Sequence, residues 1–474
     1  MLVILIPVLQ ARWVVKGNSL IYYGLREKPN TFKNKIKINH KTINFINQLD
    51  GKYEINEYAE IKITRSVKSL IKQKIIVDVS EKKTSPESLD KAAFCAKCCA
   101  NDFSIPGLEL NSDGFCPVCT SFPDIKQLVS PLPVVNSISR DKKARFDVAL
   151  FYSGGKDSSY LLFYLSRILG LRVLALTWMH PFMSDNALKS IKNAKERLPE
   201  VTFVIREASE TALKKIYAKS YELQQNICIC PSIAYILFYP LLLENPVPYL
   251  VLGNEPSQSR ALIFNQLAPK FIYRPWVKNL VRYLCNIGRV TLFRRPFSKG
   301  QLEMYLLVKN FAYGKSRLLK FFGYDNEISN NLSESLSAAK EMLIPLQYAL
   351  QRSKNNKNIP ALVHVDFDKI NDKGSYDWKS VKRLIKHELD WVDIENEEKG
   401  LHTSCKLEQC KDYTQLKAFK EMNSRIIPFS SLELSLAVIQ GSITRDKAIE
   451  ELKFHAGFCI NMPEENKLIT DYIK

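Results

Sequence analysis

A loop rich in glycine, serine and charge stands between an apolar run and a helix-forming stretch. It follows residues 147–151, precedes residues 160–169, and reads Ser153-Gly154-Gly155-Lys156-Asp157-Ser158-Ser159. Two glycines let a backbone approach an anion closely, and the N–H groups at the start of a helix favour negative charge. Lys156 and the serine hydroxyls would add charge-assisted hydrogen bonds. This pattern predicts a phosphate-binding loop.

The spacing inside the loop distinguishes it from other phosphate loops. The Walker pattern G-x-x-x-x-G-K-S/T is absent here, which disfavours a kinase or a GTPase. The form SGGxDS resembles instead the loop of the N-type ATP pyrophosphatases, the PP-loop group of adenine nucleotide alpha hydrolase-like (HUP-like) proteins. That resemblance implies cleavage of ATP between its α- and β-phosphates and adenylation of a substrate oxygen. The alternative is a glycine turn that carries serines.

The loop residues differ in the chemistry they offer. Lys156 and backbone N–H groups would hold pyrophosphate as charge develops on it, and Ser153 would hydrogen-bond a phosphate oxygen. Asp157 suits Mg²⁺ or its water ligands. We expect Lys156 and Asp157 to be catalytic. The expected ATP-binding residues are Ser153, Gly154, Gly155, Lys156, Asp157, Ser158, Ser159 and Gly253.

Four cysteines form two C-x-x-C pairs upstream of the loop. They are Cys95, Cys98, Cys116 and Cys119. Such turns point two thiolates each at one ion, and four thiolates favour tetrahedral Zn²⁺, although an iron–sulfur cluster uses the same ligands. The alternative is a set of buried cysteines without metal. Cys99 is a fifth sulfur with no obvious place in the shell.

Other sulfur and imidazole groups have open roles. Cys228 and Cys230 alternate along the chain, so their thiols could form a persulfide or metal-binding pair, and simple burial is the alternative. A second metal site would require separate fragments to converge. Its ligands would come from His402, Cys405, Cys410, His455 and Cys459.

Composition indicates a folded chain of several domains. It has 474 residues, of which 46% are hydrophobic, enough for substantial cores. No apolar stretch reaches the ~18 residues of a membrane-spanning helix, and the first fifteen residues lack a basic leader and a cleavage site. We expect a cytoplasmic protein with no membrane span.

Positive charge is concentrated in one segment. The formal net charge is +19, and residues 261–320 hold twelve Lys or Arg against one acid, Glu303. Aromatic residues lie between the basic ones, as in surfaces that bind RNA or a nucleotide-linked substrate. The alternative is a solvated basic helical face.

Strand and helix patterns alternate after residue 147. Strands are expected at 147–152, 171–178, 201–205 and 248–252, and helices at 158–169, 185–197, 208–224 and 231–243. This order predicts an α/β fold with a doubly wound parallel sheet, which binds ligands beyond the carboxyl ends of its strands. Gly253 follows one such strand end.

Four domains are expected along the chain. Residues 1–88 predict a small winged-helix-like α+β domain, which resembles the peptide-chaperone domains of ribosomal peptide maturation; that resemblance implies a leader peptide bound as an added strand. Helix-turn-helix domains share its pattern. Residues 89–125 form the expected zinc knuckle, 140–350 the PP-loop ATP pyrophosphatase domain with a basic helical extension, and 351–474 a C-terminal helical segment.

Several motifs together resemble the N-acetyl sugar amidotransferase family. They are the knuckle, the SGGKDSS loop, the C-x-C pair of Cys228 and Cys230 after the third helix, the strand end at Gly253, and the segments 388–391, 402–405 and 441–449. The resemblance spans residues 92–455. It implies that ATP adenylates the amide oxygen of a nucleotide-linked N-acetyl sugar in surface polysaccharide biosynthesis, and that ammonia then displaces AMP.

The nitrogen source and the acceptor have alternatives. A built-in glutaminase would need cysteine at position 2, where this chain has Leu2, so we expect a separate glutaminase subunit. A sulfurtransferase that thiolates a tRNA base, a peptide or an amide would suit the basic segment and the Cys228 and Cys230 pair. A peptide substrate bound by residues 1–88 is a further alternative. A zinc-stabilised nucleotide sensor would bind ATP without releasing pyrophosphate.

Overall fold

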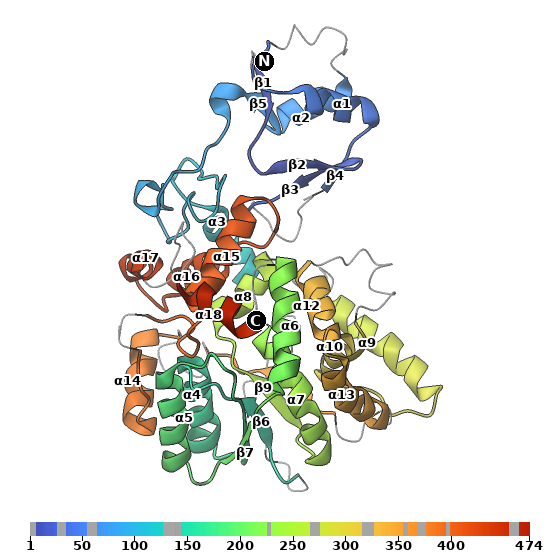
Figure 1. Cartoon of the computed structure of the whole chain (residues 1–474), viewed down its shortest axis with the longest axis vertical. Coiled ribbons are helices and arrows are strands. Elements are labelled where there is room, and N and C mark those ends of the chain that lie inside the picture. Colours follow the sequence, from blue (N-terminus) through green and yellow to red (C-terminus); the bar gives the residue numbers. More distant parts are fainter. Residues whose placement is uncertain are drawn as a thin grey trace. The chain divides into compact units, whose positions relative to one another are not determined.

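The computed structural model divides the chain into two compact units. Unit 1 comprises residues 1–122 and 415–432, and unit 2 comprises residues 123–414 and 433–474. The labels of Figure 1 are used below. The structure describes residues 6–25, 35–54, 64–126, 138, 140, 144–224, 229–265, 275–314, 327–353, 359–367, 376–394, 399–454 and 464–474.

Unit 2 is built on a five-stranded sheet in which all neighbouring strands are parallel. Its order is β10 (Ala361–His364), β9 (Tyr249–Leu252), β6 (Val148–Phe151), β7 (Val173–Trp178) and β8 (Thr202–Arg206). The middle strands β6 and β7 are apolar and almost wholly buried, as parallel strands are when helices cover both faces. The predicted doubly wound α/β fold is confirmed.

Helices alternate with the strands close to the expected positions. They are α4 (Lys156–Phe163), α5 (Asp185–Arg197), α6 (Glu210–Gln224), α7 (Cys230–Glu244) and α8 (Pro256–Phe264), with a π-helical turn (Tyr164–Ile168) after α4. The fifth strand, β10, was not expected, because the sequence predicted short helices and loops beyond residue 359. Its four residues are buried and pair with β9.

The strand order reverses direction beside β6. From β6 the chain steps outward to β7 and β8, then returns to the other side of β6 with β9 and continues to β10. In such sheets the loops after the two strands at the reversal diverge and leave a crevice at their carboxyl ends. The SGGKDSS loop follows β6, and Gly253 follows β9.

Further helices complete the chain. They are α9 (Pro275–Val290), α10 (Gln301–Tyr313), α12 (Glu327–Ser337), α13 (Lys340–Arg352), α14 (Trp378–Leu389), α15 (Glu408–Lys420), α16 (Phe429–Gln440), α17 (Arg445–Phe454) and α18 (Glu464–Ile473). Apolar side chains of α7, α10 and α13 form one core with the sheet. Among the described residues, no helix is both long and apolar enough to cross a membrane.

Unit 1 contains two small antiparallel sheets. One pairs β1 (Pro7–Leu9) with β5 (Ile76–Asp78), and the other orders β2 (Trp13–Lys16), β3 (Ser19–Tyr22) and β4 (Lys35–Lys37). Its helices are α1 (His40–Gln48), α2 (Arg65–Lys72) and α3 (Pro117–Lys126). Asn39 and Thr64 cap α1 and α2 through side-chain oxygens.

Residues 415–432 join unit 1 through a buried arginine. The Arg12 guanidinium lies 4.0 Å from the centre of the Phe419 ring and donates to the backbone oxygens of Tyr23 and Lys420. Burial lowers the pKa of Arg12 to about 10. A second link is the hydrogen bond of 2.8 Å between the hydroxyls of Ser104 and Ser431.

Candidate nucleotide-binding and metal sites

Backbone geometry in the SGGKDSS loop requires glycine. Gly154 has a φ of 72°, and a Cβ there would lie 2.5 Å from the backbone oxygen of Ala187. No other residue fits this turn without displacing α5. Gly155 caps α4 without a side-chain hydrogen bond, so the first turn of α4 presents its N–H groups at the carboxyl end of β6.

The serines of the loop divide into outward and inward groups. Ser153 is exposed, whereas Ser158 and Ser159 are buried. The Ser158 hydroxyl accepts from the Ser153 N–H at 3.3 Å and donates to the Gly155 oxygen at 3.1 Å. The Ser159 hydroxyl donates to the Tyr152 hydroxyl at 3.4 Å. Ser153 is therefore placed for a ligand, while Ser158 and Ser159 also hold the loop in shape.

Lys156 is a buried cation in an aromatic and acidic environment. Its side chain is 1% exposed and forms an ion pair with Asp157. The ammonium lies 4.8 Å from the ring centres of both Tyr376 and Trp378, a cation–π distance. The Tyr376 hydroxyl donates to the Asp157 carboxylate at 2.7 Å. These contacts hold the Lys156 ammonium in position at the N-terminus of α4.

Glu255 lies beside this group, directly after β9. It is 1% exposed, accepts from the Trp378 indole N–H at 2.6 Å, and accepts from the Ser257 hydroxyl. Burial raises the pKa of Glu255 to about 8, and the positive charge of Lys156 offsets only part of that effect. Glu255 is therefore mostly protonated at neutral pH.

The strand ends of β6 and β9 meet at the first turn of α4. A Cβ on Gly253 would lie 3.7 Å from the Cβ of Ser158, an ordinary van der Waals contact. Gly253 is therefore next to the loop, as the sequence predicted.

Two residues far along the chain contact the loop backbone. The Trp391 indole donates to the Gly154 oxygen at 2.9 Å, and the Thr403 hydroxyl accepts from the Lys156 N–H at 3.1 Å. Thr403 thus accepts a hydrogen bond from an N–H at a helix N-terminus, and a phosphate oxygen could accept from the same N–H. The sequence singled out the segments 388–391 and 402–405 as motifs without indicating this role.

The imidazole of His402 is 20% exposed and lies among charged groups. Its Nε2 lies 2.9 Å from a Glu433 oxygen, 3.6 Å from a Glu408 oxygen and 3.2 Å from the Lys411 ammonium. Burial alone would lower the pKa of His402, but the two carboxylates outweigh burial and raise it. An ion-pair network of this kind explains His402 without a metal.

The second sulfur-containing metal site is not formed within the described residues. The described His, Cys, Asp and Glu side chains give a single candidate metal cluster, the four paired cysteines. His455, Cys459 and Cys228 lie outside the described residues, as does the side chain of Cys410. The proposed pairing of Cys228 with Cys230 therefore stays a prediction.

Two partly buried cysteines of unit 2, Cys230 and Cys405, come from segments far apart in the sequence. Cys230 and Cys405 are both partly buried, and both pack against the core of unit 2. The Tyr217 hydroxyl is buried near them. Burial raises the pKa of Tyr217, and Cys230 and then Cys405 raise it further. Two thiols from separate segments thus lie near one phenol.

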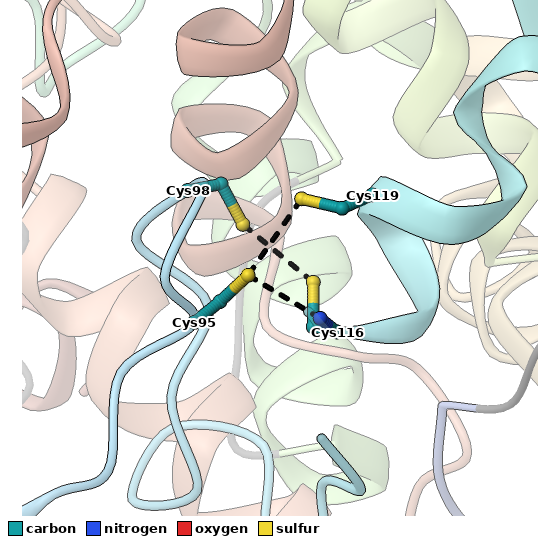
Figure 2. Close-up of side chains that lie close together, drawn as sticks. All are labelled: Cys95, Cys98, Cys116 and Cys119. Carbon is teal, nitrogen blue, oxygen red and sulfur yellow. Dashed lines mark hydrogen bonds between the residues drawn. The ribbon is translucent and has the colours of Figure 1, made fainter. Parts of the chain in front are cut away.

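The four paired cysteines of unit 1 converge on one point (Figure 2). Cys95 and Cys98 come from a loop, and Cys116 and Cys119 lie at the start of α3. The sulfur of Cys95 is 3.7 Å from that of Cys119, and the sulfur of Cys98 is 3.6 Å from that of Cys116. Four sulfurs bound at about 2.3 Å around one tetrahedral ion would be about 3.8 Å apart. The spacing therefore fits a single ion.

The surroundings of the sulfurs also suit thiolates. Backbone N–H groups of Ala100 and Cys116 point at Cys98 and Cys95, at 3.4 and 3.3 Å. Cys99 is buried but lies outside the cluster. The predicted metal ligands are thus brought together, and the fifth cysteine is left out.

No protein-family model matches this chain, and no curated protein matches it. Among solved structures, the chain is similar to the U34-tRNA thiolase NcsA from Methanococcus maripaludis with its 4Fe-4S cluster, with 15% identity and a TM-score of 0.23. That similarity covers 64% of this chain and 99% of the thiolase. What this chain does is therefore inferred from its own residues.

The structure adds three side chains that the sequence did not single out as site residues. Tyr376, Trp378 and Glu255 surround Lys156 and Asp157. Tyr376 and Trp378 lie too far along the chain from the loop for the sequence to relate them to it. Glu255 was visible as an acid directly after a predicted strand, and the strand-end rule could have found it.

We predict that Cys116→Ser abolishes metal binding by unit 1. The wild-type chain should hold metal at the four cysteines, because metal binding at such a site is coupled to folding. The variant should lose that metal and unfold at a lower temperature, measured by elemental analysis and thermal melting. Cys99→Ser, also buried, is the control and should keep the metal. Equal metal content in both variants would contradict the assignment.

Glu255 should make the stability of the protein depend on pH. Its folded-state pKa of about 8 exceeds the ordinary glutamate value of about 4.3, so the folded state keeps a proton that the unfolded state releases. The free energy of unfolding should therefore fall as pH rises from about 4.3 to about 8.

Glu255→Gln tests this prediction because it keeps an acceptor for Trp378 and removes the titrating group. Denaturant titrations across this pH range should show a flatter dependence in the variant than in the wild type. Glu222→Gln, on an exposed ion pair with Lys219, is the control and should follow the wild type. A Glu255→Gln curve parallel to the wild type would refute the role of Glu255.

Proposed function

We propose that this chain is an ATP-dependent enzyme of the PP-loop type, which transfers AMP to a substrate oxygen and releases pyrophosphate. The observation that carries the proposal is the position of the SGGKDSS loop. It lies at the carboxyl end of β6, where the strand order reverses, and it opens α4. Nucleotides bind at such reversal points, with phosphate at the helix N-terminus.

The site offers the groups that such a reaction needs. N–H groups of α4 and the hydroxyl of Ser153 would bind phosphate oxygens, and Lys156 would stabilise the negative charge that develops on departing pyrophosphate. The Asp157 carboxylate is 16% exposed and supplies the oxygen ligands that Mg²⁺ prefers. When bound there, Mg²⁺ would neutralise phosphate charge.

The reaction turns a poor leaving group into a good one. The substrate oxygen attacks the α-phosphorus of ATP, the bond between that phosphorus and the bridging oxygen breaks, and pyrophosphate departs with the electron pair. A nucleophile then attacks the carbon that bears the AMP, and AMP leaves with the former substrate oxygen. The chain's own residues hold the phosphates and position the oxygen.

We infer that the acceptor is the amide of a nucleotide-linked N-acetyl sugar and that the nucleophile is ammonia from a separate glutaminase. Support comes from the family resemblance of two segments that contact the loop. Trp391 and Thr403, which lie in these segments, bind the backbone at Gly154 and Lys156. The motifs that carry the resemblance thus lie at the proposed site of adenylation.

A sulfurtransferase is the second candidate, and one observation favours it. Cys230 and Cys405, two partly buried thiols from separate segments, both pack against the core of unit 2. Sulfur transfer by a persulfide needs a thiol near the adenylated substrate and a second thiol to release the product by disulfide formation. The acceptor would then be an oxygen of a base, a peptide or an amide.

For the metal, we propose zinc in a structural role. Four buried thiolates at the spacing of one tetrahedral ion support zinc over a four-iron cluster, in which each cysteine binds a different iron and the sulfurs are held further apart. Elemental analysis of the purified chain separates these cases, since zinc predicts one ion per chain and the cluster predicts iron and sulfide.

Lys156→Met should abolish adenylation while keeping the fold. Methionine fills the buried space against Tyr376 and Trp378 but carries no charge. AMP and pyrophosphate formation should fall at least about 10²-fold, the usual effect of removing one donor to developing charge. The measurement is AMP release from ATP and Mg²⁺ with candidate acceptors. Lys215→Met, on an exposed ion pair, is the control. Undiminished pyrophosphate release by folded Lys156→Met would overturn the proposal.

The double variant Cys230→Ser with Cys405→Ser separates ammonia from sulfur as the nucleophile. An ammonia-using enzyme should keep its turnover when free ammonia is supplied. A sulfurtransferase should lose turnover with a persulfide donor and still release pyrophosphate, because adenylation precedes sulfur transfer. Cys285→Ser, an exposed cysteine on α9, is the control. Full loss of ammonia-dependent turnover in the double variant would contradict the amidotransferase proposal.

A further inference from the structure

The helix α9 turns an apolar stripe outward. Its exposed apolar residues recur every three or four positions, so they share one face. With their exposed fractions they are Trp276 (64%), Leu280 (46%), Tyr283 (64%), Leu284 (58%), Ile287 (46%) and Val290 (58%). The stripe continues into the turn after α9 with Leu292 (63%) and Phe293 (100%). In Figure 1, α9 is the yellow helix at the margin of unit 2.

The opposite, polar face of α9 makes the contacts with the rest of unit 2. Lys278 pairs with Glu303 at 3.7 Å, and Asn286 exchanges hydrogen bonds of 3.0 and 2.8 Å with the backbone of Phe297. The Arg289 guanidinium lies 4.0 Å from the centre of the Phe297 ring. Helices on globular proteins normally bury their apolar stripe and expose their polar face. α9 does the reverse.

Phe293 is exposed at a backbone position that favours glycine. Its φ is 55°, and the Arg294 N–H donates to the Arg289 oxygen at 2.9 Å, a bond that closes the end of a helix. A bulky residue at positive φ is a conformational outlier. Neither the turn nor packing in unit 2 accounts for a fully exposed phenylalanine there.

Positive charge accompanies the apolar stripe. Residues 275–300 contain six basic side chains and no Asp or Glu; the basic residues are Lys278, Arg282, Arg289, Arg294, Arg295 and Lys299. A basic helix with tryptophan, phenylalanine and leucine on one face has the composition of helices that lie in the plane of a membrane surface. Tyrosine and tryptophan also favour that interface.

We propose that α9 and the turn through Phe293 dock this protein on an anionic lipid bilayer. The apolar stripe enters the boundary between headgroups and acyl chains, and the exposed basic residues after the turn, Arg295 and Lys299, pair with anionic headgroups. RNA fits this surface less well, because most of the exposed apolar residues of the stripe are aliphatic (Leu280, Leu284, Ile287, Val290 and Leu292), and aliphatic side chains cannot stack on bases. The absence of a spanning helix among the described residues agrees with a peripheral contact.

Vesicle binding by the full-length protein tests this proposal. Phosphatidylcholine vesicles with about one third phosphatidylglycerol should sediment the protein, and pure phosphatidylcholine should bind it about tenfold less. Raising the salt concentration should weaken binding to the anionic vesicles. Protein that stays in the supernatant with both kinds of vesicle at low salt would overturn the proposal.

Variants locate the contact on the molecule. Leu280→Ser with Ile287→Ser should reduce binding to anionic vesicles on the order of tenfold or more. Phe293→Gly should also reduce it, and this change keeps the fold because glycine adopts the positive φ freely. Ile344→Ser on α13 removes an equally exposed apolar residue, 62% exposed, and should bind like the wild type.

Fluorescence gives a position-specific result that non-specific adsorption does not. Brominated lipids should quench part of the protein's tryptophan emission, and Trp276→Phe should lose that quenching while still binding vesicles. Two outcomes would overturn the membrane contact. The first is that Phe293→Gly and the double variant Leu280→Ser with Ile287→Ser both bind vesicles as tightly as the wild type does. The second is that the wild type binds no vesicles, while these variants lose self-association or RNA binding.

Discussion

The buried charge of Lys156 constrains the architecture of unit 2. A cation with 1% of its side chain exposed needs compensating groups, because burial removes its hydration. Asp157 supplies one charge from the same helical turn, but the remaining surface of the ammonium is covered by Tyr376 and Trp378. The segment that carries Tyr376 and Trp378 follows Lys156 by more than 200 residues in the sequence. It must therefore return to the loop in the fold. The strand β10 and helix α14, which flank Tyr376, bring it there.

The charged groups around Lys156 carry little net charge at neutral pH. Two carboxyl groups, Asp157 and Glu255, lie near one lysine, and burial keeps Glu255 mostly protonated by raising its pKa to about 8. Lys156 and Asp157 then remain as a pair without excess negative charge. An ionised Glu255 would repel a polyphosphate in a region of low dielectric, where repulsion is strong. The indole of Trp378 therefore contacts both groups: its ring lies against the Lys156 ammonium, and its N–H donates to Glu255.

Local sequence patterns predicted the strands and helices near the loop. They did not predict the contacts between residues far apart in the sequence. The strand, loop and helix at residues 147–163 follow from apolar runs and glycines that are adjacent in sequence. The strand β10 follows a run of helices from α9 to α13, so its pairing with β9 is a long-range contact that no local period indicates. The contacts of Trp391 and Thr403 join residues that no spacing relates. For α9, periodicity identifies an apolar stripe but assumes that the stripe faces inward.

Thr403 shows how the loop depends on the segments that cover it. Its hydroxyl accepts the Lys156 N–H at 3.1 Å, which is one of the donors that a phosphate at this helix N-terminus would require. A hydroxyl and a phosphate oxygen are alternative acceptors for that N–H, and the phosphate bond is stronger because its acceptor is charged. The Thr403 backbone is joined to α5 through Ser184, and Trp391 holds the Gly154 oxygen. A phosphate bound at this N–H would therefore displace the Thr403 hydroxyl and remove one hydrogen bond between the loop and residues 399–405.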